Sequence, residues 1–122
     1  MDTKTLVWFS RHDPTPEQTA DLNARGITRI VKVNMQATDG KHIWEVCCDV
    51  VDAGMLPEVI MCIAPPQFYA DLLRLANPAN CHIIRAQMLY EVDADGKRTN
   101  APPTWAGTWE RIIRVEVVTE AW

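Results

Sequence analysis

Three consecutive residues near the N-terminus, Ser10, Arg11 and His12, are of the types best suited to binding an anion. Arginine pairs with a phosphate through its planar guanidinium group, and a serine hydroxyl donates a hydrogen bond to a phosphate oxygen. A histidine beside them can move a proton near neutral pH. These residues follow an apolar run and precede a helix start signal, so the sequence predicts a phosphate-binding turn between a strand and a helix.

The predicted helix begins with a recognisable N-terminal signal. Thr15 is expected to be the N-cap, Pro16 the first helical residue, and Gln18 the partner of Thr15 in a capping box. A helix N-terminus directs backbone N–H groups and the positive end of its dipole toward one point. We therefore expect Thr15, Gln18 and these amides to complete the phosphate site. The alternative interpretation is a capping turn that carries two exposed basic side chains.

Apolar periodicity and turn residues predict the elements that must position this turn. Strands are expected at residues 5–10, 27–34, 58–64, 82–92 and 109–119. Helices are expected at residues 16–25, 43–51 and 67–76. The run at 59–63 is apolar throughout, which is typical of a central parallel strand buried on both faces. The last two strands are joined without a helix and are expected to pair antiparallel.

This order of elements predicts one domain over residues 1–122, a Rossmann-like three-layer α/β sandwich with a mostly parallel sheet and antiparallel C-terminal strands. Ligands of such sheets bind at the carboxyl ends of the strands, where the strand order reverses. If the strands at 5–10 and 58–64 are neighbours, the reversal lies between Ser10 and the segment that starts at Pro65.

Residues on the far side of this reversal extend the candidate site. Pro66 and Gln67 begin the third predicted helix, and we interpret Gln67 and Tyr69 as contacts for a base or a ribose. Asn34 ends another strand at the same predicted edge, where it could contact an anion or a nucleobase. The alternative interpretations are a proline-initiated helix and a solvated strand end.

Composition narrows the class of ligand. The net charge of −4 argues against a general duplex-DNA binder but allows a local basic pocket for a small anion. The sequence has no glycine-rich motif of the dinucleotide or nucleoside triphosphate type. No cofactor or metal is expected, and no apolar run approaches the length of a membrane span. The four cysteines are expected to be reduced and mostly buried, as in a cytoplasmic protein: Cys47, Cys48, Cys62 and Cys81.

Trp105 and Trp109 fall in the stretch 99–109, which we interpret as a loop. Tryptophans in a mobile loop can stack on nucleobases. The alternatives are that they pack the loop onto the domain or form a dimer contact.

The segment 9–18 (FSRHDPTPEQ) resembles the start of small CRISPR-associated proteins of type III systems. These often begin with a strand, a Ser-His or Ser-Arg-His element, a threonine, and a glutamine near the helix start. The later strand running into Ala64-Pro65-Pro66, a helix and two C-terminal strands are also similar. Ser10, His12, Thr15 and Gln18 carry over as ligand-pocket candidates, Arg11 is added for its chemistry, and no catalytic residue of the family can be matched.

The resemblance implies a compact Rossmann-like, CARF-like domain that forms homodimers and binds a cyclic oligoadenylate at the dimer interface. Several such proteins are ring nucleases that cut this second messenger, and others only sequester it. A two-fold dimer suits a cyclic ligand because each subunit presents the same residues to equivalent phosphates.

Together these observations predict a cytoplasmic homodimer that takes part in type III CRISPR antiviral signalling, with cyclic tetra-adenylate as the leading ligand. The expected reaction is metal-independent attack of a ribose 2′-OH on the adjacent phosphorus. Arg11 would stabilise negative charge, and His12 would transfer a proton. Two alternatives stay open: a sponge that binds without cutting, and a small α/β phage or defence interaction protein without a nucleotide ligand.

Overall fold

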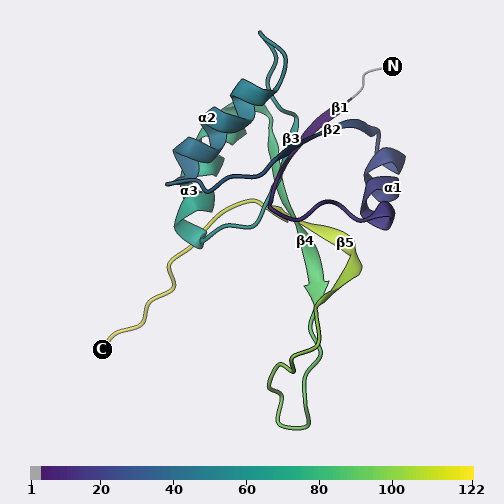
Figure 1. The fold of residues 1–122 in the computed structure, drawn as a ribbon. Coiled ribbons are helices and arrows are strands. Elements are labelled where there is room, and N and C mark those ends of the chain that lie inside the picture. Colours follow the sequence, from purple (N-terminus) through teal and green to yellow (C-terminus); the bar gives the residue numbers. More distant parts are fainter. Residues whose placement is uncertain (1–3) are drawn as a thin grey trace.

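The computed structural model describes residues 4–122, and its sheet carries helices on both faces (Figure 1). The strands are β1 (Lys4–Phe9), β2 (Ile27–Val33), β3 (Val59–Cys62), β4 (His82–Leu89) and β5 (Thr104–Ile112). The helices are α1 (Pro16–Ala24), α2 (Gly40–Val50) and α3 (Pro66–Ala76), followed by a single 3-10 turn, η1 (Asn77–Ala79). The alternation of strands and helices predicted from the sequence is confirmed.

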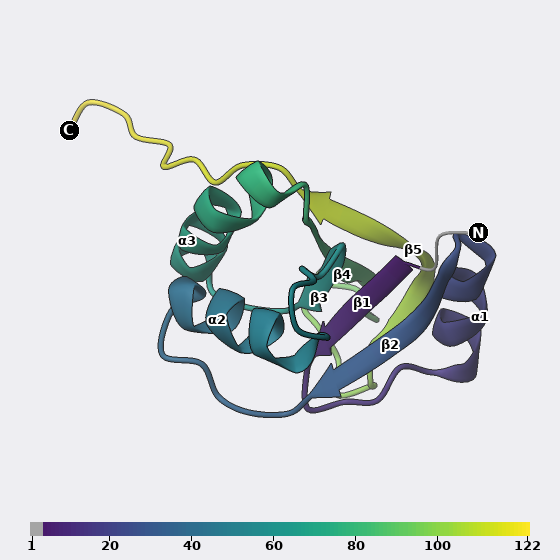
Figure 2. The same ribbon diagram turned by 90° about the horizontal axis from the view of Figure 1, so that it is seen from above.

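The five strands lie in the order β2-β1-β3-β4-β5. The first four of these are parallel and β5 runs antiparallel to β4, as expected. Viewed along the sheet, α1 covers one face while α2 and α3 cover the other (Figure 2). The arrangement is compatible with a Rossmann-like sandwich, and β1 and β3 are indeed neighbours. The strand order therefore reverses between β1 and β3.

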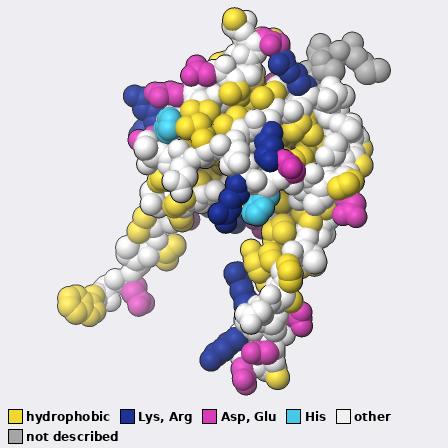
Figure 3. Space-filling view, in the orientation of Figure 1, with side chains coloured by type: hydrophobic (Ala, Val, Ile, Leu, Met, Phe, Trp, Pro, Cys, Tyr) yellow, Lys and Arg dark blue, Asp and Glu magenta, His cyan; other side chains and the backbone are white. Residues whose placement is uncertain are grey.

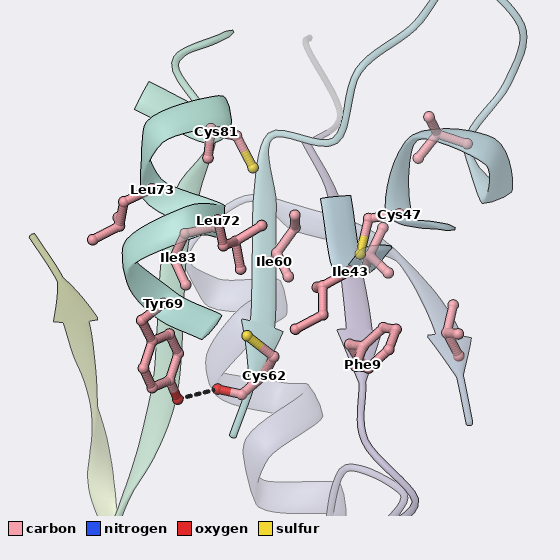
Figure 4. Close-up of a cluster of buried hydrophobic side chains, with 14 residues drawn as sticks. Phe9, Ile43, Cys47, Ile60, Cys62, Tyr69, Leu72, Leu73, Cys81 and Ile83 are labelled. Carbon is pink, nitrogen blue, oxygen red and sulfur yellow. Dashed lines mark hydrogen bonds between the residues drawn. The ribbon is translucent and has the colours of Figure 1, made fainter. Parts of the chain in front are cut away.

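The larger core lies between the sheet and the α2–α3 pair (Figure 4). Val7, Ile60 and Leu72 have no exposed surface, because β1 and β3 are central strands and the apolar stripe of α3 faces them. The two helices approach so closely at Gly40 that a Cβ atom there would lie 2.1 Å from the Phe68 carbonyl oxygen. Only glycine fits this position.

A smaller core lies on the α1 face, and Trp109 packs against it. Trp109 lies in β5, where its ring packs edge-on against Trp8 with a centroid separation of 6.0 Å. The Trp109 indole N–H also donates to the Asp21 carboxylate of α1 at 2.6 Å. The loop prediction was wrong for Trp105, which lies in β5, whereas Trp109, the expected first residue of the last strand, is a strand residue as predicted. The packing alternative is the one that the structure supports for Trp109.

Three predicted strands end earlier than expected. β3 stops at Cys62, the last residue aligned with β1, so Ile63 leaves the sheet and is 68% exposed. β4 stops at Leu89, although an isolated bridge between Val92 and Arg98 continues the hairpin toward its tip. β5 ends at Ile112, and residues 113–122 run past α3 without regular structure (Figures 1 and 2).

Tyr69 is a core residue and not a ligand contact. Its side chain is 3% exposed, and its hydroxyl donates to the Cys62 carbonyl oxygen at 2.7 Å (Figure 4). Cys47, Cys62 and Cys81 are buried free thiols, as predicted. Burial raises the pKa of Cys62 and Cys81 to about 12, so both thiols stay protonated at neutral pH. Among the helices in the described part of the chain, none has the length and apolar character to cross a membrane.

Candidate functional site

The carboxyl ends of β1, β2 and β3 surround an open crevice of about 650 Å³, which we call the strand-end crevice. It lies at the point where the strand order reverses. Its lining consists of residues that end these strands or follow them directly: Phe9, Ser10, Arg11, His12, Asn34, Met35, Gln36 and Ile63. The structure therefore brings Ser10, Arg11, His12 and Asn34 together, as the sequence predicted.

Hydrogen bonds hold the backbone of the turn that carries these residues. The Trp8 indole N–H donates to the His12 carbonyl oxygen at 2.6 Å, and the His12 amide donates to the Ser10 hydroxyl at 3.2 Å. The Ser10 amide donates to the Val33 carbonyl oxygen at 3.1 Å, which ties the turn to β2. These bonds leave the Arg11 and His12 side chains exposed at the crevice wall.

The crevice is locally basic although the protein is acidic. Arg11 and His12 line it, and no carboxylate does so. Asp13, the nearest acidic residue along the chain, forms an ion pair with Lys32 of β2. Within residues 4–122, Arg11 has no ion-pair partner, so its guanidinium group is available to an anion. Figure 3 shows basic and histidine side chains side by side at the lower edge of the domain.

Thr15 and Gln18 form the predicted capping box. The Gln18 amide donates to the Thr15 hydroxyl at 3.1 Å, and the Thr15 amide donates to the Gln18 side-chain oxygen at 2.9 Å. Pro16 has no N–H, and the Thr19 amide donates to the Thr15 carbonyl oxygen. At most the Glu17 amide is left for a ligand. The expectation that several helix amides cradle a phosphate was therefore wrong.

The capping box also lies beside the crevice and not in it. Thr15 and Gln18 line a hollow of about 310 Å³ on the α1 side, the helix-side hollow, which Ser10, His12 and Tyr90 also border. Ser10 and His12 are therefore shared by two adjoining hollows. The single pocket expected from the sequence is divided, with the turn at residues 10–12 between its two parts.

Pro66 and Gln67 are exposed at the start of α3 and line neither of these hollows. Their neighbours Pro65 and Phe68 instead line a third hollow of about 490 Å³. That hollow shares four residues with the strand-end crevice: Phe9, Met35, Gln36 and Ile63. The segment at the start of α3 thus borders the site through Pro65 rather than through Gln67.

Sequence reasoning missed Met35, Gln36 and Ile63 as lining residues. The signal that could have found them is the one that selected Asn34, namely a position directly after a parallel strand. Ile63 in particular was assigned to the buried strand, because its apolar character continues the run of β3.

A scan against protein-family models and searches of the curated proteins and of the solved structures found no match. The chemistry of the site therefore has to be derived from its own residues.

Two properties define what this site can bind. An exposed guanidinium group and an imidazole on a wall without carboxylates can pair with a phosphate and exchange a proton with it. The part of the chain that the structure describes contains no group of three or more His, Cys, Asp and Glu placed to hold a metal ion. The crevice offers a binding surface for an anion in which Arg11 supplies the charge.

Proposed function

We propose that the protein binds a cyclic oligoadenylate, with cyclic tetra-adenylate as the leading candidate, in the strand-end crevice. The observation that carries this proposal is the presence of Arg11 and His12 on a crevice that no carboxylate lines, at the reversal of strand order. The strand-end crevice is open and has a volume of about 650 Å³, which suits a ligand larger than a mononucleotide. The resemblance of segment 9–18 to type III CRISPR-associated, CARF-like proteins favours an adenylate ring.

A homodimer is part of this proposal. Ile63 is 68% exposed and Met35 is 43% exposed, and both border the crevice. A second subunit related by a two-fold axis would cover this apolar surface and present a second Arg11 to the ligand. A ring of identical nucleotides has the symmetry that such a site requires.

Cleavage of the bound ring is the reaction that these residues support best. The 2′-oxygen of one ribose would attack the adjacent phosphorus, and the bond from phosphorus to the 5′-oxygen would break. The products are a 2′,3′-cyclic phosphate and a 5′-hydroxyl group. Arg11 would stabilise the charge on the phosphoryl oxygens, and His12 would take the 2′-OH proton or protonate the leaving 5′-oxygen.

Binding is tested by replacing Arg11 with alanine. Loss of a charge-assisted hydrogen bond costs about 1.5–3 kcal/mol, which corresponds to roughly a 10- to 150-fold weaker affinity for cyclic tetra-adenylate by calorimetry. Arg74→Ala is the matched control, because Arg74 is an exposed arginine on α3 that lines none of the hollows at the strand ends. Equal affinities of Arg11→Ala and wild type would refute the placement of the ligand.

Cleavage is tested by incubating cyclic tetra-adenylate and cyclic hexa-adenylate with wild type, His12→Ala and His82→Ala. His82 is an exposed histidine at the opposite end of the sheet and serves as the control. His12→Ala should slow product formation more than it weakens binding. A tight complex with an uncut ring would identify a sponge instead, and an absence of binding to either ring would favour an interaction protein.

A further inference from the structure

The β4–β5 hairpin extends beyond the carboxyl end of the sheet and borders another hollow. Ile84 is the last β4 residue aligned with β3, yet β4 continues to Leu89, which pairs with Thr104. The hairpin then reaches further, below the sheet in Figure 1. A hollow of about 380 Å³, the hairpin-side hollow, lies at its base, and its polar and aromatic lining is Arg85, Gln87, Tyr90, Arg98 and Glu110.

An aromatic ring and a guanidinium group are stacked at this hollow. The Arg98 guanidinium carbon lies 3.7 Å from the centroid of the Tyr90 ring, and Tyr90 is 45% exposed. The hairpin tip is ordered by the Asp93 carboxylate, which accepts from two amides of the turn. The Thr99 amide donates to the Glu91 carbonyl oxygen at 3.0 Å. These hydrogen bonds hold the backbone of the hairpin that carries the Tyr90–Arg98 stack.

The hollow carries a net positive charge. Arg85 donates to Glu110 on the neighbouring strand at 2.6 Å, and this pair is neutral overall. Arg98 has no carboxylate partner among the ion pairs of residues 4–122, so one positive charge remains. Gln87 lies two residues from Arg85 and hence on the same face of β4, where its amide can both donate and accept hydrogen bonds.

The hairpin-side hollow shares a lining residue with the strand-end crevice. Ile63 borders the strand-end crevice, the helix-side hollow and the hairpin-side hollow. His12 and Tyr90 both border the helix-side hollow. Arg98 lies on the hairpin beyond the end of β4, across from Val92, and it lines the hairpin-side hollow, whereas Arg11 lines the strand-end crevice. Because Ile63 borders both hollows, a ligand of several nucleotides can extend from the crevice past Ile63 into the hairpin-side hollow.

We propose that the hairpin-side hollow is a second nucleotide subsite, which takes the unit adjacent to the one bound at Arg11. The base of this second nucleotide stacks on the Tyr90–Arg98 pair, and its phosphate faces the positive charge of Arg98. Gln87 contacts the edge of the same base. This inference rests on the proposed function, because it assigns a second unit of the same ligand. It makes the hairpin a determinant of ligand length.

The test compares ligands of one and two nucleotides. Calorimetry with 5′-AMP and with the linear dinucleotide pApA measures how much the second unit adds to affinity. In the wild type, pApA should bind on the order of 10-fold more tightly than AMP, the scale of one stacked base. Arg98→Ala and Gln87→Ala should each remove most of this gain and leave the affinity for AMP unchanged.

Lys97→Ala is the matched control, because it removes a positive charge from the same hairpin without touching the hollow. Circular dichroism of each variant checks that the hairpin substitutions leave the fold intact, and Gln87→Ala tests the subsite without disturbing the Tyr90–Arg98 stack. An unchanged ratio of pApA to AMP affinity in both Arg98→Ala and Gln87→Ala, with binding still dependent on Arg11, overturns the second subsite alone. No binding of AMP, pApA or cyclic tetra-adenylate overturns the proposed function as well.

Discussion

Replacing Trp109 with phenylalanine should destabilise the protein by about 2 kcal/mol. The substitution keeps an aromatic ring in β5 but removes the N–H that donates to Asp21 at 2.6 Å. A hydrogen bond to a charged group contributes about 1.5–3 kcal/mol. The low end applies, because the Asp21 side chain is 29% exposed and shares the same oxygen with Arg25. Part of the edge-on contact with Trp8, about 0.5–1.5 kcal/mol for such a pair, is lost in addition.

Lowering the pH should reduce the difference in unfolding free energy between the wild type and Trp109→Phe. Hydrogen bonds from Arg25 and from Trp109 lower the pKa of Asp21 below the ordinary carboxyl value of 3.8. A group whose pKa is lower in the folded state stabilises that state above the unfolded pKa, and this stabilisation is lost as the pH falls through the folded pKa. The gap in unfolding free energy should therefore narrow below about pH 4.

Urea unfolding followed by far-ultraviolet circular dichroism measures these free energies for wild type, Trp109→Phe, Asp21→Ala and the double variant. The double-mutant cycle isolates the Asp21–Trp109 interaction from the contact with Trp8 and from the Arg25 ion pair. A coupling of about 1.5 kcal/mol at pH 7 is expected, the low end of the range for a hydrogen bond to a charged group. A coupling within about 0.3 kcal/mol of zero would show that the hydrogen bond between α1 and β5 does not stabilise the fold and that Trp109 acts through packing alone.

Two further predictions concern the other core. Gly40→Ala should destabilise the protein by about 1–3 kcal/mol and lower the midpoint of thermal unfolding, because the added Cβ would lie 2.1 Å from the Phe68 carbonyl oxygen. The control Lys41→Ala should have a midpoint near that of the wild type. An unchanged midpoint for Gly40→Ala would contradict the close contact between the helices. In the folded protein a thiol reagent should modify Cys48, which is partly exposed, and should reach Cys47, Cys62 and Cys81 only after denaturation, because burial keeps these thiols protonated. Rapid modification of more than one thiol without denaturant would contradict this burial.

Local signals were sufficient to predict most elements of the fold. The Thr15 capping box, the apolar run of β3 and the apolar stripe of α2 each depend on residues that are close in sequence. These are the features that a single sequence expresses directly.

The start of β5 could not be predicted because the strand contains a bulge. Ala86 pairs with Trp109 and Met88 pairs with Trp105, so one residue of β4 faces three residues of β5. Gly107 lies inside this bulge with a φ of +83°, a conformation that favours glycine. From sequence, the glycine indicated a loop end, and the period-2 pattern was interrupted at the same place.

The division of the site into two hollows depends on two side-chain contacts that direct the turn after Ser10. The course of the turn after Ser10 is set by the Trp8 indole and by the ion pair between Asp13 and Lys32 of β2. Neither contact has a pattern in the sequence that predicts it. The residue types at the strand end were therefore predictable, but the face of the sheet on which each lies was not.

Because the capping box occupies the first turn of α1, anion binding here depends on side chains rather than on helix amides. This distinction predicts the behaviour of Arg11→Lys. If amides held the phosphate, either basic residue at position 11 would serve, since only a nearby positive charge would be needed. If the guanidinium group pairs directly with the phosphate, lysine keeps the charge but loses the planar fork of donors.

Arg11→Lys should therefore bind cyclic tetra-adenylate less tightly than wild type, yet the slope of log affinity against log salt should stay the same. Arg11→Ala should lower both the affinity and the slope, because one fewer positive charge meets the phosphates. Titrations at several salt concentrations separate the two effects. Equal binding by Arg11→Lys and wild type would mean that charge alone is recognised. The phosphate would then lie too far from Arg11 for the direct pairing on which the proposed stabilisation of the reacting phosphoryl group depends.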